Sequence, residues 1–331
     1  MRNSDNTKAR VMVLTDISSL TGGVLEPDDA QSMIRFLLYT NEFDVEGLIA
    51  TAYGTHGIHP DYIRTLVLEY GKIWKNLASH DAAYPSCETL LSLVKSGSSK
   101  CGMDELGEGK DTEASDWIIS AADKPDERPL WLLLWGGALD LAQAVWKVKT
   151  TRTDNECRAF LTKLRVYAIG DQYDGCGPWI RANCPELFYI TNYYAFRGMY
   201  RGGDEQLTGP AWVNRNIFGH GALSECYPMY QGGDPWGEVR GIKEGDTPSF
   251  LYLIPNGIHD PENPRDARWG GQFEPVENTE ECRHFSDITV SLEDAAKTVS
   301  RWRADFQEDF ARRLEWCVEI PAIYIGDINE T

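Results

Sequence analysis

The feature that most constrains the fold is an alternation of short apolar runs with helical patterns along much of the chain. Residues 10–15 form an apolar run with β-branched side chains that ends at Asp16, which is typical of a buried strand. Residues 30–39 keep apolar side chains at helical spacing, and residues 45–52 form a second strand-like run. This order predicts a βαβ unit with parallel strands and a right-handed crossover.

The same alternation recurs further along the chain. We expect strands at residues 130–135, 164–169, 187–191 and 250–254, and a helix at residues 138–145. Near the carboxyl end, Ser291 and Asp294 resemble a capping box, and an apolar stripe follows at helical spacing: Val299, Trp302, Phe306, Phe310 and Leu314. The sequence shows no repeats and no clear linker. We therefore predict one α/β domain over residues 1–331, with residues 1–9 as a disordered tail.

The composition narrows the classes of partner. The 331 residues include 51 Asp and Glu against 32 Lys and Arg, which gives a formal net charge of −19. This balance disfavours nucleic acid and anionic membrane surfaces, since both are bound by basic residues. No run approaches the ~20 apolar residues that span a bilayer, and the first ten residues lack an apolar signal-peptide segment. We expect a cytoplasmic protein, with secretion as the alternative if a leader precedes this chain.

Acidic residues recur where the predicted strands and the first helix meet. They follow three predicted strands or open the helix at residues 30–39: Asp16, Asp28, Asp29, Asp171, Asp174 and Asp260. Ligands of open α/β sheets bind outside the carboxyl ends of the strands, so several of these carboxylates are expected to converge there. Converging carboxylates repel one another unless a cation lies between them. Ligands that are all oxygens favour Ca²⁺, with Mg²⁺ as the second choice.

Each of these acids also has a plain structural interpretation. An Asp pair before a helix usually caps it and interacts with its dipole. His259 with Asp260 fits an exposed turn, and residues 171–174 fit ordinary turn chemistry. Only the joint placement at strand ends favours a metal site over these alternatives.

Several stretches resemble the nucleoside hydrolases. Residues 14–16, followed by residues 26–29 at the start of a helix, are similar to the amino-terminal Asp motif of that family. The likeness is closer to a bacterial and fungal nucleoside-hydrolase-like branch, some members of which carry a cellulose-binding label. Further similar stretches lie at residues 135–144, 171–174 with 179–181, 244–254 and 269–271, so that the resemblance covers roughly residues 10–317. It implies a Rossmann-like α/β fold with a mostly parallel central sheet flanked by helices.

The resemblance also implies roles for individual residues. The metal ligands for Ca²⁺ would be Asp16, Asp29, Asp260 and the backbone carbonyl of Leu139. Asp16 would also accept a proton from the attacking water, and His259 would protonate the leaving group, with His56 as a second candidate donor. The substrate-binding residues would be Asp28, Thr55, His56, Asp171, Gln172, Asp174, Trp179, Arg181 and Trp269. Trp179, Trp269 and Tyr173 are candidates for stacking on a sugar or an aromatic leaving group.

The main functional hypothesis is a metal-dependent hydrolase that cleaves an N-glycosidic or related glycosidic bond. Thr55 and Asp171 stand where the family has sugar-binding asparagines, which argues against plain ribose as the sugar. One alternative is a carbohydrate-binding protein with the same fold and little catalysis. Another is a biosynthetic enzyme that processes an unusual nucleoside-like glycoside. We expect a small-molecule nucleoside or glycoside as the partner, and a homo-oligomer as the assembly.

Overall fold

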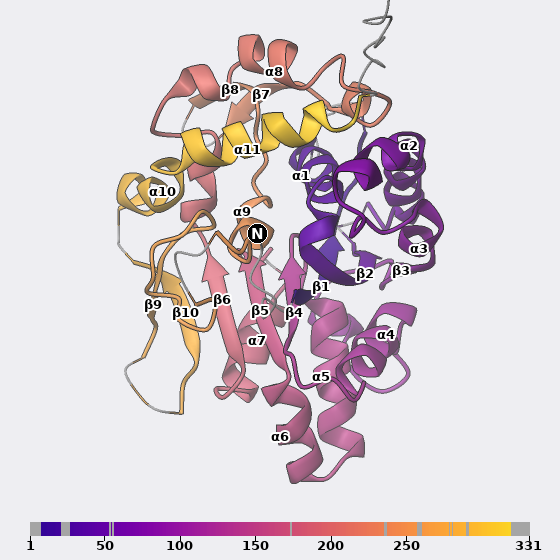
Figure 1. Cartoon of the computed structure of the whole chain (residues 1–331). Helices are drawn as coiled ribbons and strands as arrows, with labels where there is room; N and C mark the ends of the chain where they lie inside the picture. Colours follow the sequence, from indigo (N-terminus) through magenta and orange to yellow (C-terminus); the bar gives the residue numbers. More distant parts are fainter. Residues whose placement is uncertain are drawn as a thin grey trace, which may run out of the picture.

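The structure is a computed structural model, and it describes residues 8–20, 27–52, 54, 56–172, 174–234, 237–256, 260–277, 279, 281–288 and 291–318. Within these residues, eight strands form one sheet in the order β3-β2-β1-β4-β5-β6-β10-β9 (Figure 1). The strands are β1 (Ala9–Thr15), β2 (Phe43–Ala50), β3 (Val94–Ser96), β4 (Leu130–Leu134), β5 (Leu164–Ile169), β6 (Phe188–Asn192), β9 (Phe273–Pro275) and β10 (His284–Asp287). Neighbouring strands are parallel except for β9 and β10, which are antiparallel.

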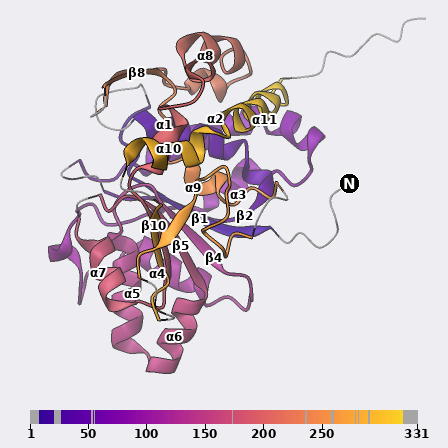
Figure 2. The same cartoon turned by 90° about the vertical axis from the view of Figure 1, so that its left-hand side faces the viewer.

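Helices cover both faces of this sheet (Figure 2). One face carries α4 (Glu113–Ala122), α5 (Leu139–Thr151), α6 (Asp154–Thr162) and α7 (Cys176–Asn183). The other carries α1 (Pro27–Leu37), α2 (Pro60–His80), α9 (Pro248–Leu251), α10 (Leu292–Ser300) and α11 (Arg303–Glu315). The remaining elements are α3 (Cys87–Ser92), α8 (Pro210–Asn216), a hairpin of β7 (Tyr230–Asp234) and β8 (Gly237–Gly241), and the 3₁₀ turns Thr40–Glu42, Met103–Glu105, Ala195–Met199, Glu205–Leu207 and Ser224–Cys226.

The first strand shows why both faces are apolar. Successive side chains of a strand point to opposite faces, so Val11 and Val13 pack in one core cluster and Met12 and Leu14 in the other. All four are fully buried, since a parallel sheet with helices on both faces has no solvated side. The near-continuous apolar runs of the sequence follow from this arrangement.

The chain order places a switch point between β1 and β4. From β1 the chain builds outward through β2 to β3, and it then returns to the other side of β1 to place β4, β5 and β6. In open α/β sheets, the loops that leave these two central strands diverge and open a crevice at their carboxyl ends. Asp16 after β1 and Trp135 after β4 therefore stand at the expected position of a ligand site.

Most of the expected elements are confirmed. The βαβ unit over residues 9–50 and the strands β4, β5 and β6 lie where the sequence predicts them. The strand expected at residues 250–254 is wrong, because this buried apolar run forms the helix α9 and the turn behind it. The carboxy-terminal stripe is divided between α10 and α11, and Ser291 accepts a hydrogen bond from the Asp294 amide as the cap of α10. In the described part of the chain, no helix is both long and apolar enough to cross a membrane.

Candidate functional site

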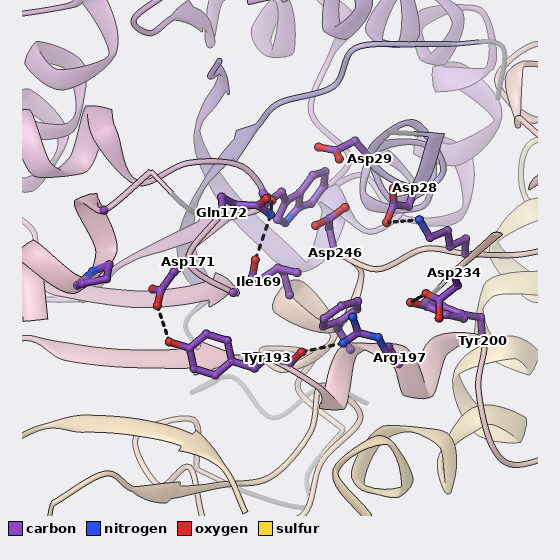
Figure 3. A pocket seen from close by; sticks show the side chains of 16 residues that line it. Asp28, Asp29, Ile169, Asp171, Gln172, Tyr193, Arg197, Tyr200, Asp234 and Asp246 are labelled. Carbon is purple, nitrogen blue, oxygen red and sulfur yellow. Dashed lines mark hydrogen bonds and ion pairs between the residues drawn. The ribbon is translucent and has the colours of Figure 1, made fainter. Parts of the chain in front are cut away.

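A cavity of about 580 Å³ lies at the carboxyl ends of the central strands, within the usual size range of ligand pockets (Figure 3). It is lined by Asp28, Asp29, Trp135, Ile169, Gly170, Asp171, Gln172, Gly175, Pro178, Tyr193, Phe196, Arg197, Tyr200, Asp234, Lys243 and Asp246. Four of these residues belong to the substrate- or metal-binding set predicted from the sequence: Asp28, Asp29, Asp171 and Gln172. The other lining residues were not predicted.

Two buried acids lie close together at the floor of the cavity, Asp29 in its lining and Asp16 beside it. Asp16 and Asp29 are only 3% and 2% exposed. Burial, followed by the charges of Asp29 and Asp28, raises the pKa of Asp16 well above its ordinary value. Burial and the charge of Asp28 raise the pKa of Asp29 to about 7, although the Thr15 hydroxyl donates a hydrogen bond to it. The pair therefore holds more negative charge than its surroundings offset.

Two further acids stand on the same side of the cavity. Figure 3 shows Asp28, Asp29 and Asp246 grouped there. A Cβ atom on Gly245 would lie 2.8 Å from the Asp28 carboxylate, which shows how closely the segment before α9 approaches α1. Lys243 Nζ lies 4.0 Å from Asp28 Oδ2, so one cation faces this group. We call Asp16, Asp28, Asp29 and Asp246 the acidic corner.

The turn between β4 and α5 fits tightly against the acidic corner. A Cβ atom on Gly136 would lie 2.6 Å from Thr51 Oγ1 and 2.8 Å from the Asp16 Cβ, so only glycine fits. The Asp174 carboxylate accepts hydrogen bonds from the amides of Ala138 and Cys176, both at 2.8 Å. Asp174 therefore joins the turn after β4 to the loop after β5, and burial raises its pKa. Leu139 is the buried first residue of α5, beside this turn.

The opposite wall carries a carboxylate that is paired. Asp171 follows β5, and its two oxygens accept hydrogen bonds from Arg181 Nη1 at 2.7 Å and Nη2 at 2.9 Å. The Tyr193 hydroxyl also donates to Asp171 (Figure 3). Beside it, Gln172 has a φ of 49°, and its amide donates to the carbonyls of Trp135 and Ile169. This left-handed conformation is uncommon for a residue other than glycine and is found disproportionately at functional sites.

Other predicted residues do not line the cavity. His56 is exposed in a turn, and Trp179 packs against the core cluster beneath α4 to α7. Trp269 packs on Phe306, with 6.5 Å between the ring centroids. The predicted stacking roles of the two tryptophans therefore have no geometric support in this cavity.

The structure separates Asp260 from the other predicted metal ligands. Asp260 is exposed, and its carboxylate accepts a hydrogen bond from the Glu262 amide at 3.0 Å. Glu262 pairs with Arg165 at 2.8 Å, near the amino end of β5, whereas the cavity lies beyond the carboxyl end of that strand. In the described structure, Asp260 therefore does not lie at the carboxyl edge with the other predicted ligands.

Three predicted residues lie outside the described part of the chain. They are Thr55, Tyr173 and His259. Their proposed roles in sugar binding, stacking and proton donation stay predictions.

Asp246 was missed by sequence reasoning although its surroundings carry a signal. It precedes Thr247 and Pro248, and proline in the first turn is typical of a helix start. The Ser249 amide and hydroxyl both donate to the Asp246 carbonyl, and the Trp135 indole donates to Ser249 Oγ at 2.7 Å. These contacts attach the start of α9 to the end of β4 and so bring Asp246 to the cavity.

The chemistry of the acidic corner suits a hard cation. It offers only oxygen donors, and the raised pKa values of Asp16 and Asp29 show that its charge is only partly offset. No three His, Cys, Asp or Glu side chains among the described residues are arranged to hold a metal ion. The donor types therefore fit Ca²⁺, while a complete ligand set is not assembled in the described residues. Calcium binding stays a prediction.

Comparison with known families identifies the family of the chain. The family described as "Cellulose-binding Sde182, nucleoside hydrolase-like domain" matches residues 10–273. The chain belongs to this family. The mostly parallel, Rossmann-like sheet and the resemblance to nucleoside hydrolases are thereby confirmed for this Sde182-like protein. No curated protein matches it.

One solved structure is similar over most of the Sde182-like chain. It is a nucleoside hydrolase-related hypothetical protein from Saccharophagus degradans that is associated with carbohydrate metabolism. The two sequences are 31% identical, the TM-score is 0.75, and the match covers 95% of this chain and 72% of the other. Two effector structures match more weakly. XOO4466 has 10% sequence identity to this chain, a TM-score of 0.46 and 94% coverage of both chains. XopQ complexed with adenosine diphosphate ribose has 11% sequence identity, a TM-score of 0.40, and coverage of 94% of this chain and 95% of the other.

Proposed function

We propose that the Sde182-like chain hydrolyses a glycosidic bond of a carbohydrate or nucleoside-like substrate in the cavity above β1 and β4. The observation that carries this proposal is the pair of buried, neighbouring carboxylates of Asp16 and Asp29 at the sheet's switch point. Cleavage of a glycosidic bond passes through an oxocarbenium-like state, and carboxylates stabilise its developing positive charge. The acidic corner, whose negative charge is only partly offset, would stabilise this positive charge.

The residues of the acidic corner take distinct roles in this proposal. Asp16 accepts the proton of the attacking water in its ionised form, which a bound cation would favour, and Asp28 accepts hydrogen bonds from the sugar hydroxyls. Asp16, Asp29 and Asp246 would hold the Ca²⁺ ion, which supplies a Lewis acid that lowers the pKa of water. His259 stays the predicted proton donor to the leaving group. Further candidates for donating this proton among the described lining residues are the Tyr193 and Tyr200 hydroxyls and the Lys243 ammonium group.

Asp171 supports a substrate other than a plain ribonucleoside. It stands where the resemblance places a sugar-binding amide, but both of its oxygens are engaged by Arg181 and Tyr193. A ribose bound as in the nucleoside hydrolases would lose this contact. This observation favours an altered sugar or a larger glycoside.

The experiment combines metal analysis with turnover. Purified protein is dialysed against Ca²⁺, its bound metal is measured by mass spectrometry, and nucleosides and aryl glycosides are screened as substrates. We expect about one Ca²⁺ per chain and turnover of at least one glycoside, both lost in Asp29→Asn. Metal-free protein with no turnover of any substrate would overturn the proposal.

A second candidate is carbohydrate binding without catalysis. The family description names cellulose binding, and the described acids do not assemble a metal site of three ligands. Saturable sugar binding by the wild type, unchanged in Asp16→Asn and without any hydrolysis, would favour this candidate.

A further inference from the structure

Two adjacent tyrosines stand exposed at the mouth of the cavity. Tyr193 lines the cavity and is 37% exposed, and Tyr194 is 39% exposed. Their ring centroids lie 6.4 Å apart and their planes are inclined by 51°, so neither ring covers the other. Among the exposed large hydrophobic residues of the described chain, these two are the only aromatic ones. We call Tyr193 and Tyr194 the tyrosine platform.

A buried carboxylate fixes the backbone of this platform. Asp287, the last residue of β10, accepts hydrogen bonds from the amides of Tyr193 at 2.7 Å, Tyr194 at 3.2 Å and Ala195 at 2.8 Å. Burial raises the pKa of Asp287, and these amides oppose that shift. Three consecutive amides can meet one carboxylate only if the turn has one backbone conformation. The backbone of the platform is therefore held in place while its rings are exposed.

Contacts inside the cavity fix the first ring as well. The Tyr193 hydroxyl donates to Asp171, which is held by Arg181, and Arg197 Nη1 donates to the Tyr193 carbonyl at 2.8 Å (Figure 3). In this view the Asp171 and Tyr193 pair stands apart from Asp28, Asp29 and Asp246. Tyr193, the platform residue that lines the cavity, thus lies on the side away from the acidic corner.

We propose that the tyrosine platform is an outer subsite that stacks on a sugar ring of a neutral glycan chain whose end occupies the cavity. This inference deepens the proposed function and rests on it for the identity of the inner ligand. Tyrosine gives a rigid contact area at low entropic cost, and one side of a pyranose ring presents C–H groups that pack on an aromatic face. A neutral chain is favoured over a uronic acid polymer because Asp28, Asp29 and Asp246 line the cavity that would hold its end, and the protein carries a net charge of −19.

The test compares two sugars by isothermal titration calorimetry on the whole chain loaded with Ca²⁺. Cellopentaose reaches beyond the cavity and glucose does not, so the ratio of their affinities measures the outer subsite. We expect the wild type to bind cellopentaose more tightly than glucose. Tyr194→Ala should reduce that ratio roughly five- to tenfold, as expected for the loss of one aromatic contact.

Two matched variants separate stacking from general damage. Tyr194→Phe keeps the ring and should keep the ratio within about twofold. Leu68→Ala removes an exposed apolar side chain of α2, which does not line the cavity, and should leave the ratio unchanged. Asp287→Asn should lower the ratio without lowering the glucose affinity to the same extent, provided that its thermal melt shows a folded protein.

The outcomes also separate this inference from the proposed hydrolysis. A Tyr194-dependent preference for cellopentaose in a protein without turnover supports the platform while hydrolysis fails. Turnover of a small glycoside with no preference for cellopentaose overturns the platform while hydrolysis stands. An equal ratio in wild type and Tyr194→Ala also overturns the platform.

Discussion

Asp16 and Asp171 occupy comparable positions in the two central parts of the sheet but have opposite electrostatic surroundings. Each follows a parallel strand, β1 or β5, at the same edge. Asp171 faces a guanidinium and a phenol, whereas Asp16 faces the carboxylate of Asp29. A carboxylate whose charge is already offset by a neighbouring cation contributes to the stability of the fold. A carboxylate whose charge is not offset can still interact strongly with a bound ligand. The surroundings of a strand-end acid therefore distinguish a structural role from a chemical one.

The largest expected effect concerns Asp16, which faces the carboxylate of Asp29. Asp16→Asn should lower turnover of the best glycoside found by screening by about 10²–10⁴-fold, because the attacking water loses its base. The free energy of unfolding at pH 7 should not fall, since an amide beside Asp29 removes repulsion. Steady-state kinetics and urea unfolding check both parts. A wild-type rate in this variant would show that the acidic corner is not used in catalysis.

Asp140 provides an intermediate case, because it is buried and hydrogen-bonded, and no cation among the described residues pairs with it. Its Oδ1 accepts from the Thr112 hydroxyl at 2.7 Å and the Ser98 amide at 3.0 Å, yet burial raises its pKa to about 6. A raised folded-state pKa stabilises the protein below pH 4, and this contribution is lost as the pH rises through 6. Asp140→Asn keeps both acceptor contacts, so it should be more stable than wild type by about 3 kcal/mol at pH 8.

Urea unfolding at several pH values checks this expectation for Asp140→Asn. The difference between variant and wild type should shrink to near zero at pH 4. A difference that does not change with pH would show that proton binding by Asp140 is not its source.

A third comparison sets Asp246 against Asp260. The sequence predicts Asp260 as the metal ligand, whereas the structure brings Asp246 to the cavity. Asp246→Asn should reduce turnover and bound Ca²⁺ affinity by about 10²-fold, similar to other losses around a metal site. Asp260→Asn should change both by less than about twofold. The reverse order in kinetics and metal titration would restore the sequence-based assignment.

The smallest expected effect concerns Asp171, whose carboxylate is paired with Arg181. Arg181→Met leaves Asp171 without its bidentate partner and should lower the free energy of unfolding by about 2 kcal/mol, less than for a fully buried pair because both side chains are about one-fifth exposed. Adding Asp171→Asn should recover part of this loss. If the double variant is no more stable than Arg181→Met in urea unfolding, the charge of Asp171 is not the source of the cost.

The parts of the fold that local patterns encode were predictable. β1, α1 and β2 follow from apolar spacing within about 40 residues, and Asp16, Asp28 and Asp29 came with them. The run at residues 250–254 was assigned to the wrong class, because a short buried apolar segment has no period that separates strand from helix. Asp260 was predicted as a metal ligand from the family resemblance, and Asp246 was not predicted at all.

Other features depend on contacts between distant residues and leave little local signal. β9 and β10 are three and four residues long and carry polar side chains, so no alternation marks them. The anchoring of Tyr193 by Asp287 joins positions 94 residues apart. The hydrogen bond from Arg181 to Asp171 depends on how α7 is placed beside the end of β5. The sequence alone is equally compatible with an Asp171 carboxylate that is free to bind a sugar.

The glycine turn after β4 has a consequence for redesign of this protein. Any side chain at Gly136 would collide with Thr51 and Asp16, so this part of the floor accepts only glycine. The rim, by contrast, is formed by separate segments that contribute lining residues, such as the turn at Tyr193 and the strand β7 at Asp234. Selectivity should therefore be alterable by exchanging whole rim segments while the floor is kept intact. Libraries confined to the rim are expected to contain far more folded variants than libraries that include the floor.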